Sequence, residues 1–245
     1  MRNIKLTIQF DGTAYHGWQI QKGDTTVQQT IRDTLSTILN TPVTLHGSGR
    51  TDAGVHALGQ VAHFLTDSAM KTQALVKALN ALLPHDIAVK DAEDVAPDFH
   101  ARFSATERVY WYLIWNTPVR SPFYRRYSWH IIQPLDIAAM KDAAACLVGT
   151  HDFTSFQGSD KEEVNPVREV TSIRLRKTRR HIILFEINAN AFLKHMVRNT
   201  IGTLADVGRG KLTGNEFRRI LDGKDRRLAG ITAPAQGLFL KHVRY

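Results

Sequence analysis

The stretch "GSGRTDAGVHALGQVAHF" (residues 47–64) joins a glycine-rich loop to a run of alternating apolar residues. Its first half sets one arginine and one aspartate between glycines, a composition typical of a loop that approaches a ligand. Its second half predicts a strand over residues 60–65. The segments on either side of this stretch indicate the fold class.

The residues before the loop predict a strand, a helix and a second strand. Apolar side chains alternate with polar ones over residues 2–10, which is typical of a half-buried strand. A helix is expected over residues 26–39, where apolar residues recur at helical spacing and Asn40 follows. Residues 43–46 predict a short strand.

The residues after the loop continue the pattern. A helix is expected over residues 71–83, with Leu75, Leu79 and Leu82 on one face and Pro84 to end it. A strand follows over residues 87–93. The order is therefore β-α-β-β-α-β, the ferredoxin-like or split-βαβ unit.

The second half of the chain repeats this order without an obvious repeat of residues. Asp136 is expected to cap a helix that ends at Gly149. The other predicted elements are strands over 105–116, 167–177, 181–189 and 237–243, and helices over 193–207 and 216–221.

These patterns predict an α+β fold of two ferredoxin-like halves. We expect the halves to share one mostly antiparallel sheet, with helices on one side and a ligand cleft between the halves. The boundary is expected near residues 95–104, which assigns residues 1–100 to an N-terminal half with the glycine-rich loop. Residues 101–245 form the C-terminal half.

Composition narrows the functional class. The 245 residues carry a net charge of +9, which concentrates polyanions such as nucleic acid at the surface, although a solvated basic surface has the same charge. No apolar run approaches the roughly 18 residues of a membrane span. The N-terminus lacks the apolar core of a signal peptide, and Cys146 is the only cysteine. A reducing, cytoplasmic setting is expected.

Basic residues gather in two tracts. "VRSPFYRRYSWH" (residues 119–130) mixes arginines with aromatic residues, and "RLRKTRRH" (residues 174–181) packs basic residues around a turn. Arginines bind phosphates, and aromatic rings stack on exposed bases. Both tracts therefore indicate RNA contact, although an arginine-rich sheet edge that discourages aggregation has the same composition.

Asp52 is the candidate for chemistry that remains after common motifs are excluded. The chain has no phosphate-binding loop with lysine, no nucleophile elbow and no compact histidine spacing for a metal. A carboxylate on a loop acts as a nucleophile or a base, yet Asp is also common in Asx-turns and helix caps. Arg50 is placed to reach a phosphate or to hold the carboxylate. The glycines at 47, 49 and 54 permit positive φ and close approach to a ligand.

Tyr110 and Arg198 are two further candidates. Tyr110 lies between Val109 and Trp111 in a predicted strand, where core or cross-strand packing is its usual role. Arg198 shares a helix face with Gly202 and is either a plain surface residue or the buried partner of a carboxylate. A glycine inside a helix costs about 1 kcal/mol relative to alanine, which indicates that something packs closely at Gly202.

Together these residues resemble the TruA-type tRNA pseudouridine synthases. "GRTDAGVHA" (49–57) is similar to the signature loop of that family. Five further blocks follow its order along almost the whole chain. They are "FDGTAYHGWQIQ" (10–21) with "TVQQTI" (26–31), "SATERVYWYLIWN" (104–116), "GTHDFTSF" (149–156), "FLKHMVRNTIG" (192–202) and "APAQGLFL" (233–240).

The resemblance implies isomerisation of uridine to pseudouridine at positions 38, 39 and 40 of the tRNA anticodon stem-loop, without a metal or cofactor. It implies a homodimer, with tRNA lying across both subunits. Asp52 would be the nucleophile, Arg198 would pair with it, and Arg50 would enter the space that the flipped nucleotide leaves. Tyr110 would stack on the base, and Leu238 would pack against the base or that tyrosine.

Two other functions fit parts of the sequence. One is an RNA-binding or chaperone-like module that kept the fold and lost the chemistry, which the set of Asp52, Tyr110 and Arg198 argues against. The other is an enzyme acting on a small molecule, which the basic charge and the missing cofactor motifs disfavour.

Overall fold

The computed structural model describes residues 1–159, 164–178 and 181–245. Contacts divide the chain into two compact units, Met1–Thr106 with Phe239–Tyr245 and Glu107–Leu238. The final strand therefore groups with the N-terminal unit, whereas the sequence placed it in a C-terminal half of residues 101–245. The reason is strand pairing, because Phe239 and Leu240 lie in parallel register with His56 and Ala57.

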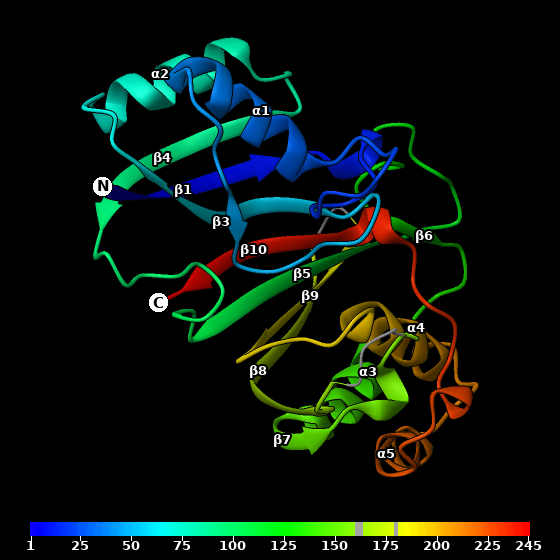
Figure 1. Cartoon of the computed structure of the whole chain (residues 1–245). Coiled ribbons are helices and arrows are strands. Elements are labelled where there is room, and N and C mark those ends of the chain that lie inside the picture. The colour runs from blue at the N-terminus through cyan, green and yellow to red at the C-terminus, as the bar shows by residue number, and fades with distance from the viewer. Residues whose placement is uncertain (160–163, 179–180) are drawn as a thin grey trace. The chain divides into compact units, whose positions relative to one another are not determined.

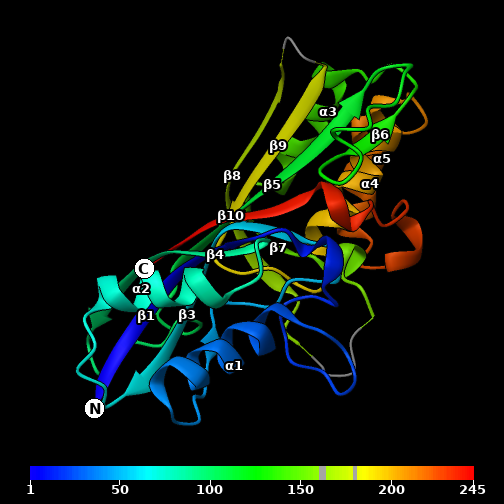
Figure 2. The ribbon, with the colours of Figure 1, turned by 90° about the horizontal axis from the view of Figure 1, so that it is seen from above.

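The first unit has the predicted order of elements. The elements are β1 (Arg2–Phe10), α1 (Val27–Leu39), β2 (His46–Gly47), β3 (His56–Thr66), α2 (Thr72–Leu82), β4 (Ile87–Val95) and β10 (Leu238–Arg244). Strand β1 lies between β3 and β4, antiparallel to both, and β2 pairs antiparallel with β3. Figure 1 shows α1 and α2 together on one face of these strands, and Figure 2 shows the same layer from above.

The core of this unit follows the sequence pattern closely. The apolar face predicted for β1 is fully or almost fully buried. The Thr26 side chain accepts a hydrogen bond from the Gln29 N–H and caps α1, and Asn40 ends that helix with a left-handed φ of 51°. These features confirm the predicted helix and its two ends.

Three details of the first unit differ from the expectation. Strand β3 begins at His56 instead of residue 60, and β2 covers two residues instead of four. Leu82, expected on one face with Leu75 and Leu79, is 59% exposed, whereas those two leucines are buried. Leu83 takes its place, because the row Leu75, Leu79 and Leu83 has the four-residue spacing of one helix face.

The elements of the second unit are β5 (Glu107–Asn116), β6 (Trp129–Ile131), α3 (Ile137–Ala144), β7 (Gly149–Asp152), β8 (Val167–Lys177), β9 (Ile182–Ala189), α4 (Met196–Gly208) and α5 (Gly214–Asp222). Strand β9 pairs antiparallel with both β5 and β8, while β7 pairs antiparallel with β8 and β6 pairs parallel with β5. Helices α3, α4 and α5 gather on one side of these strands (Figures 1 and 2).

The boundaries in this unit differ at two helices. Asp136 caps α3 as predicted by accepting a hydrogen bond from the Ala139 N–H, but that helix ends at Ala144 instead of Gly149. Helix α4 begins at Met196 instead of residue 193, because His195 has a left-handed φ of 59°. The short strands β6 and β7 were not predicted, since three or four residues carry little periodicity.

The fold is therefore mixed α+β, and its strand pairs are mostly antiparallel. One sheet shared by two ferredoxin-like halves stays a prediction. Within the described ranges, none of the helices combines the length and apolar character needed to cross a bilayer.

Candidate active site

The loop between β2 and β3 presents Arg50 and Asp52, and a buried glutamine holds its first half. Arg50 is exposed and Asp52 is half-buried. The side chain of Gln60 accepts a hydrogen bond from Ser48 Oγ at 2.6 Å and donates one to the Gly49 carbonyl at 3.1 Å. Because Gln60 is fully buried, these bonds are protected from water and tie the loop to β3.

The N-terminal segment that follows β1 holds the second half of the same loop. The Trp18 N–H donates to the Thr51 carbonyl at 3.1 Å, and the Gly54 N–H donates to the Tyr15 carbonyl at 3.3 Å. The Val55 N–H closes a turn on the Asp52 carbonyl at 3.1 Å. The backbone on both sides of Asp52 is thus fixed before any ligand binds, as a catalytic carboxylate requires.

The glycines of the loop act in different ways. Gly54 has the predicted positive φ, at 76°, whereas the other two glycines do not. Gly47 instead lies against the Trp18 indole, where a Cβ would collide with the ring, and a Cβ on Gly49 would meet open space. Of the three glycines that permit positive φ, Gly54 therefore uses that freedom, whereas Gly47 and Gly49 do not.

His56 joins three segments where the loop enters β3. Its ring is buried and stacks on Phe239 with centroids 4.7 Å apart. Its Nδ1 atom accepts a hydrogen bond from the Gly12 N–H at 3.0 Å and lies 3.1 Å from Asp11 Oδ1. Sequence reasoning assigned His56 no role of its own, yet it connects the loop to two segments of the first unit.

Tyr110 lies on β5 in the second unit. It is half-buried, opposite Ile187, and its ring packs edge-to-face against Phe192 with centroids 5.0 Å apart. The next two rings point to opposite faces, as strand geometry requires. The Trp111 indole N–H donates to Glu186 Oε2, whereas the hydroxyl of buried Tyr112 donates to the Pro234 carbonyl.

Arg198 lies on the first turn of α4 and is half-buried. Its Nε donates to the Ala233 carbonyl at 2.8 Å, and its own carbonyl accepts the Ala233 N–H at 3.1 Å. A plain surface position is therefore wrong for this residue. The paired bonds fix the guanidinium beside residue 233, shortly before β10.

Asn199 is a positioning residue that sequence reasoning missed. It is fully buried, and its side-chain amide donates to the Phe156 carbonyl at 2.8 Å. Its Oδ1 accepts hydrogen bonds from Thr232 Oγ1 at 2.7 Å and Arg226 Nη2 at 3.1 Å. Asn199 thus holds the segment before β10 against α4. The sequence signal that could have identified Asn199 is its place inside the block at residues 192–202, which also carries Arg198.

Gly202 shows why the same segment lies so close to α4. A Cβ at this position would collide with the Ile231 carbonyl oxygen. The Gly230 N–H also donates to Thr203 Oγ1 at 3.0 Å. The prediction that something packs closely at Gly202 is confirmed.

The structure brings the predicted residues together in two sets. Arg50 and Asp52 share a loop of the first unit. The second unit contains Tyr110, Arg198 and Leu238. Leu238 is its last residue, is buried, and begins β10 after a turn over Ala235–Gly237, while the rest of that strand belongs to the first unit. The meeting of these two sets in one site stays a prediction.

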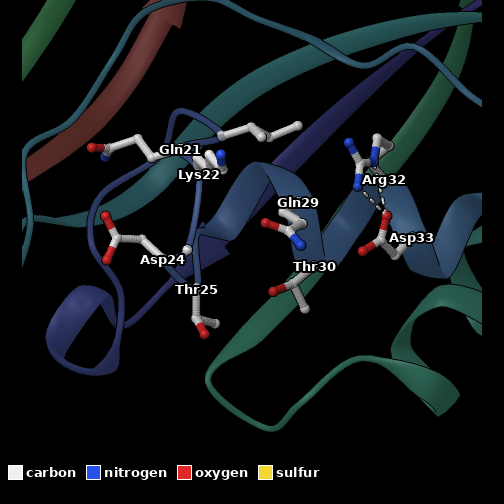
Figure 3. A pocket seen from close by; sticks show the side chains of 10 residues that line it. Gln21, Lys22, Asp24, Thr25, Gln29, Thr30, Arg32 and Asp33 are labelled. Carbon is white, nitrogen blue, oxygen red and sulfur yellow. Dashed lines mark hydrogen bonds and ion pairs between the residues drawn. The ribbon is translucent and has the colours of Figure 1, made fainter.

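A polar hollow of about 490 Å³ lies between residues 20–25 and the start of α1. Figure 3 shows its polar side chains, with Arg32 bonded to the neighbouring Asp33. None of the predicted site residues lines this hollow. The described geometry therefore gives it no part in the candidate active site.

Comparison with known families defines the class of protein. A family model described as tRNA pseudouridine synthase matches residues 6–104 and 143–245, which is most of the chain. The matched residues include the loop of Asp52 and the helix of Arg198, while Tyr110 lies between the two matched ranges. The chain belongs to the tRNA pseudouridine synthase family, and it is an isomerase.

Several curated relatives carry the name tRNA pseudouridine synthase A. The protein of Thermoanaerobacter sp. strain X514 is 46% identical over the whole of both chains, and that of Ruminiclostridium cellulolyticum is 47% identical over the same extent. The protein of Coxiella burnetii strain Dugway 5J108-111 is 44% identical over all of this chain and 94% of its own length.

A solved structure of an H/ACA RNP bound to a substrate RNA containing 2′-deoxyuridine matches 82% of this chain and 44% of its own chain. The TM-score is 0.38 and the identity 12%. This similarity is too distant to support an argument about the present chain.

Proposed function

We propose that this protein isomerises uridine to pseudouridine at positions 38, 39 and 40 of the tRNA anticodon stem-loop, with Asp52 as the nucleophile. The observation that carries the proposal is the placement of Asp52. It lies in the loop that resembles the family signature, on backbone tied to Gln60 and to the segment around Trp18. A nucleophile needs such a fixed approach, because misplacement by about 1 Å can slow a reaction about 100-fold.

The reaction is redox-neutral and balances within the nucleotide. The N1–C1′ bond of uridine breaks, the uracil turns while it is held, and a C5–C1′ bond forms. C5 loses its proton, and N1 carries one in the product. The base must leave the stack first, since a stacked base does not present its glycosidic bond to a carboxylate.

The other site residues have complementary roles in this proposal. Arg198 pairs with Asp52 and keeps it ionised, and the bond from its Nε to Ala233 sets its direction. Arg50, which is exposed, fills the space that the flipped nucleotide leaves. Tyr110 stacks on the uracil, and Leu238 packs against the base or the tyrosine ring.

The tract at residues 119–130 is the proposed RNA contact of the second unit. Phe123 is 83% exposed, and the arginines at 120, 125 and 126 are exposed beside it. Trp115 on β5 and Tyr124 of the tract stack with ring centroids 4.8 Å apart, and this contact holds the tract against the strand. The second basic tract has its residues 174–178 on and just after β8, but residues 179–180 lie outside the described structure.

We also infer that the protein works as a homodimer in the cytoplasm, with tRNA across both subunits. The homodimer and the subunit-spanning RNA come from the resemblance alone. The basic charge of +9 supports a polyanionic substrate.

The test is release of tritium from tRNA labelled at uridine C5, compared between wild type and Asp52→Asn. The variant should lose turnover by several orders of magnitude while keeping its melting temperature and its tRNA affinity. Asp142→Asn, at an exposed aspartate on α3, is the control and should keep full activity. Wild-type turnover in Asp52→Asn would contradict the assignment of the nucleophile. Binding of tRNA with no tritium release by the wild type would indicate an RNA-binding module.

A further inference from the structure

The loop that follows β4 in the first unit presents an exposed aromatic ring. Phe103 is 76% exposed, and the Arg102 guanidinium lies 5.6 Å from the centre of its ring. The His100 ring also contacts this ring, with centroids 4.4 Å apart and planes tilted by 33°. A ligand that covers this ring would remove apolar area from water, which favours binding.

The loop is fixed from several directions. Asn3 on β1 donates through its amide to the Ala96 carbonyl at 3.1 Å and the Phe99 carbonyl at 2.9 Å. The Ala101 N–H donates to His63 Nδ1 at 3.1 Å, and the Tyr245 hydroxyl donates to the Ala101 carbonyl at 2.8 Å. A ring on such a loop loses little conformational entropy when it binds a partner.

Two further imidazoles pack against His100. The rings of His46, His63 and His100 lie with centroids 4.6 to 5.4 Å apart. Burial, together with the neighbouring imidazoles, lowers the pKa of His63 to about 4, and burial lowers the pKa of His100. The three histidines are not arranged to hold a metal ion, since the described residues contain no group of that kind. They hold the His100 ring that contacts Phe103, and Arg102 supplies the positive charge.

We propose that Phe103, His100 and Arg102 form a stacking platform for an unpaired base of the RNA substrate. The base would stack on the Phe103 ring, and Arg102 would contact the adjoining phosphate. The choice of RNA as the ligand rests on the proposed function, but the platform lies on a different segment from Asp52. A nucleic acid fits better than a protein, because the platform is a single ring flanked by a cation in a chain of net charge +9.

Substitutions at residue 103 test the platform through the dissociation constant for unmodified tRNA, measured by filter binding at one fixed salt concentration. Phe103→Ala should raise that constant by roughly 5- to 100-fold, the range expected when one base loses an aromatic partner. Phe103→Trp should bind as tightly as the wild type, since it keeps a stacking surface. Phe103→Leu should resemble the alanine variant, because it keeps apolar area without a π-face. Leu82→Ala removes an apolar side chain that is 59% exposed on α2 and should change nothing.

The outcomes separate the alternatives. An unchanged constant in Phe103→Ala, or wild-type binding by Phe103→Leu, would overturn the stacking platform. A changed mass in sedimentation with unchanged tRNA affinity would assign the ring to a protein contact instead. If wild type binds tRNA but forms no pseudouridine, the proposed function fails while a weakened Phe103→Ala still supports the platform. If pseudouridine forms and affinity is unaffected, the platform fails alone.

Discussion

Gly17 lies so close to the loop of Asp52 that a Cβ at residue 17 would sit 2.5 Å from the Thr51 carbonyl oxygen. Its φ of 89° is also one that other residues rarely adopt. Two independent constraints therefore require glycine at this position. The result is a direct backbone contact between the N-terminal segment and the loop that carries the proposed nucleophile.

We expect Gly17→Ala to lower the free energy of unfolding by about 2–4 kcal/mol, because backbone strain and a steric clash add at one position. Tritium release should fall more than stability alone explains, since the clash displaces the backbone beside Asp52. Urea unfolding and tritium release measured on the same preparation check both effects.

The control for this substitution is Gly23→Ala. Gly23 has a similar φ of 87°, but a Cβ there would meet nothing within 4 Å. Gly23→Ala should lower the free energy of unfolding only by the backbone strain, about 1 kcal/mol, and leave turnover unchanged. Equal losses of activity in the two alanine variants would contradict the role of the Gly17 contact.

Gly202→Ala tests the packing of the segment before β10 against α4. Helix propensity alone predicts a gain of about 1 kcal/mol in stability. The collision with the Ile231 carbonyl should reverse that sign and displace the backbone that bonds Arg198 through Ala233. Gly214→Ala, at the start of α5, meets only ordinary contacts at 3.9 Å and should be neutral or stabilising. Thermal melting of both variants checks the predicted difference, and a stabilised Gly202→Ala would refute it.

Tyr110→Phe separates ring packing from hydroxyl chemistry. The phenylalanine ring keeps the edge-to-face contact with Phe192, so stability should change by less than about 1 kcal/mol. If the hydroxyl helps to remove the C5 proton, turnover should fall about 100-fold or more while tRNA affinity stays constant. Tyr110→Leu should lower both turnover and tRNA affinity. Single-turnover kinetics with saturating enzyme distinguish these cases, and full activity in Tyr110→Phe would restrict the residue to stacking.

His63 makes stability depend on pH. Its folded pKa of about 4 is lower than the unfolded value of about 6.5, because burial and the neighbouring imidazoles of His100 and His46 disfavour the protonated ring. The folded state therefore binds fewer protons between these values, and stability should fall as the pH drops from about 6.5 to about 4. Urea unfolding at pH 7, 5.5 and 4.5 measures the slope. His63→Gln should flatten this slope, whereas Leu82→Ala, at an exposed residue of α2, should leave it as in the wild type.

Salt titration tests the proposed contact at residues 119–130. Replacement of exposed Arg125 by glutamine should reduce the slope of log affinity for tRNA against log salt by roughly 0.7 to 0.9, if it neutralises one phosphate. Arg218→Gln, on α5, where the arginine pairs with Asp222, serves as the control and should leave the slope unchanged. A slope that is the same in Arg125→Gln and the wild type would remove this residue from the interface.

Most of the secondary structure could be predicted because it depends on local periodicity. The alternation in β1, the end of α1 at Asn40 and the cap at Asp136 act within one turn or strand, and the structure confirms them. The errors fall where local signals are weak or ambiguous. The two-residue β2 depends on its pairing with β3, and no periodicity in the sequence marks the left-handed His195 or the exposed Leu82.

The sequence by itself determined the family, the order of elements and the candidate site residues, because a signature loop and five ordered blocks are read directly from the residues. Only the tertiary structure showed that Gln60, Trp18 and His56 hold the Asp52 loop and that Asn199 fixes the segment beside Arg198. It also assigned β10 to the first unit. The physical reason is that hydrogen bonds and steric exclusion between segments tens of residues apart leave no period in the sequence, whereas helices, strands and caps do.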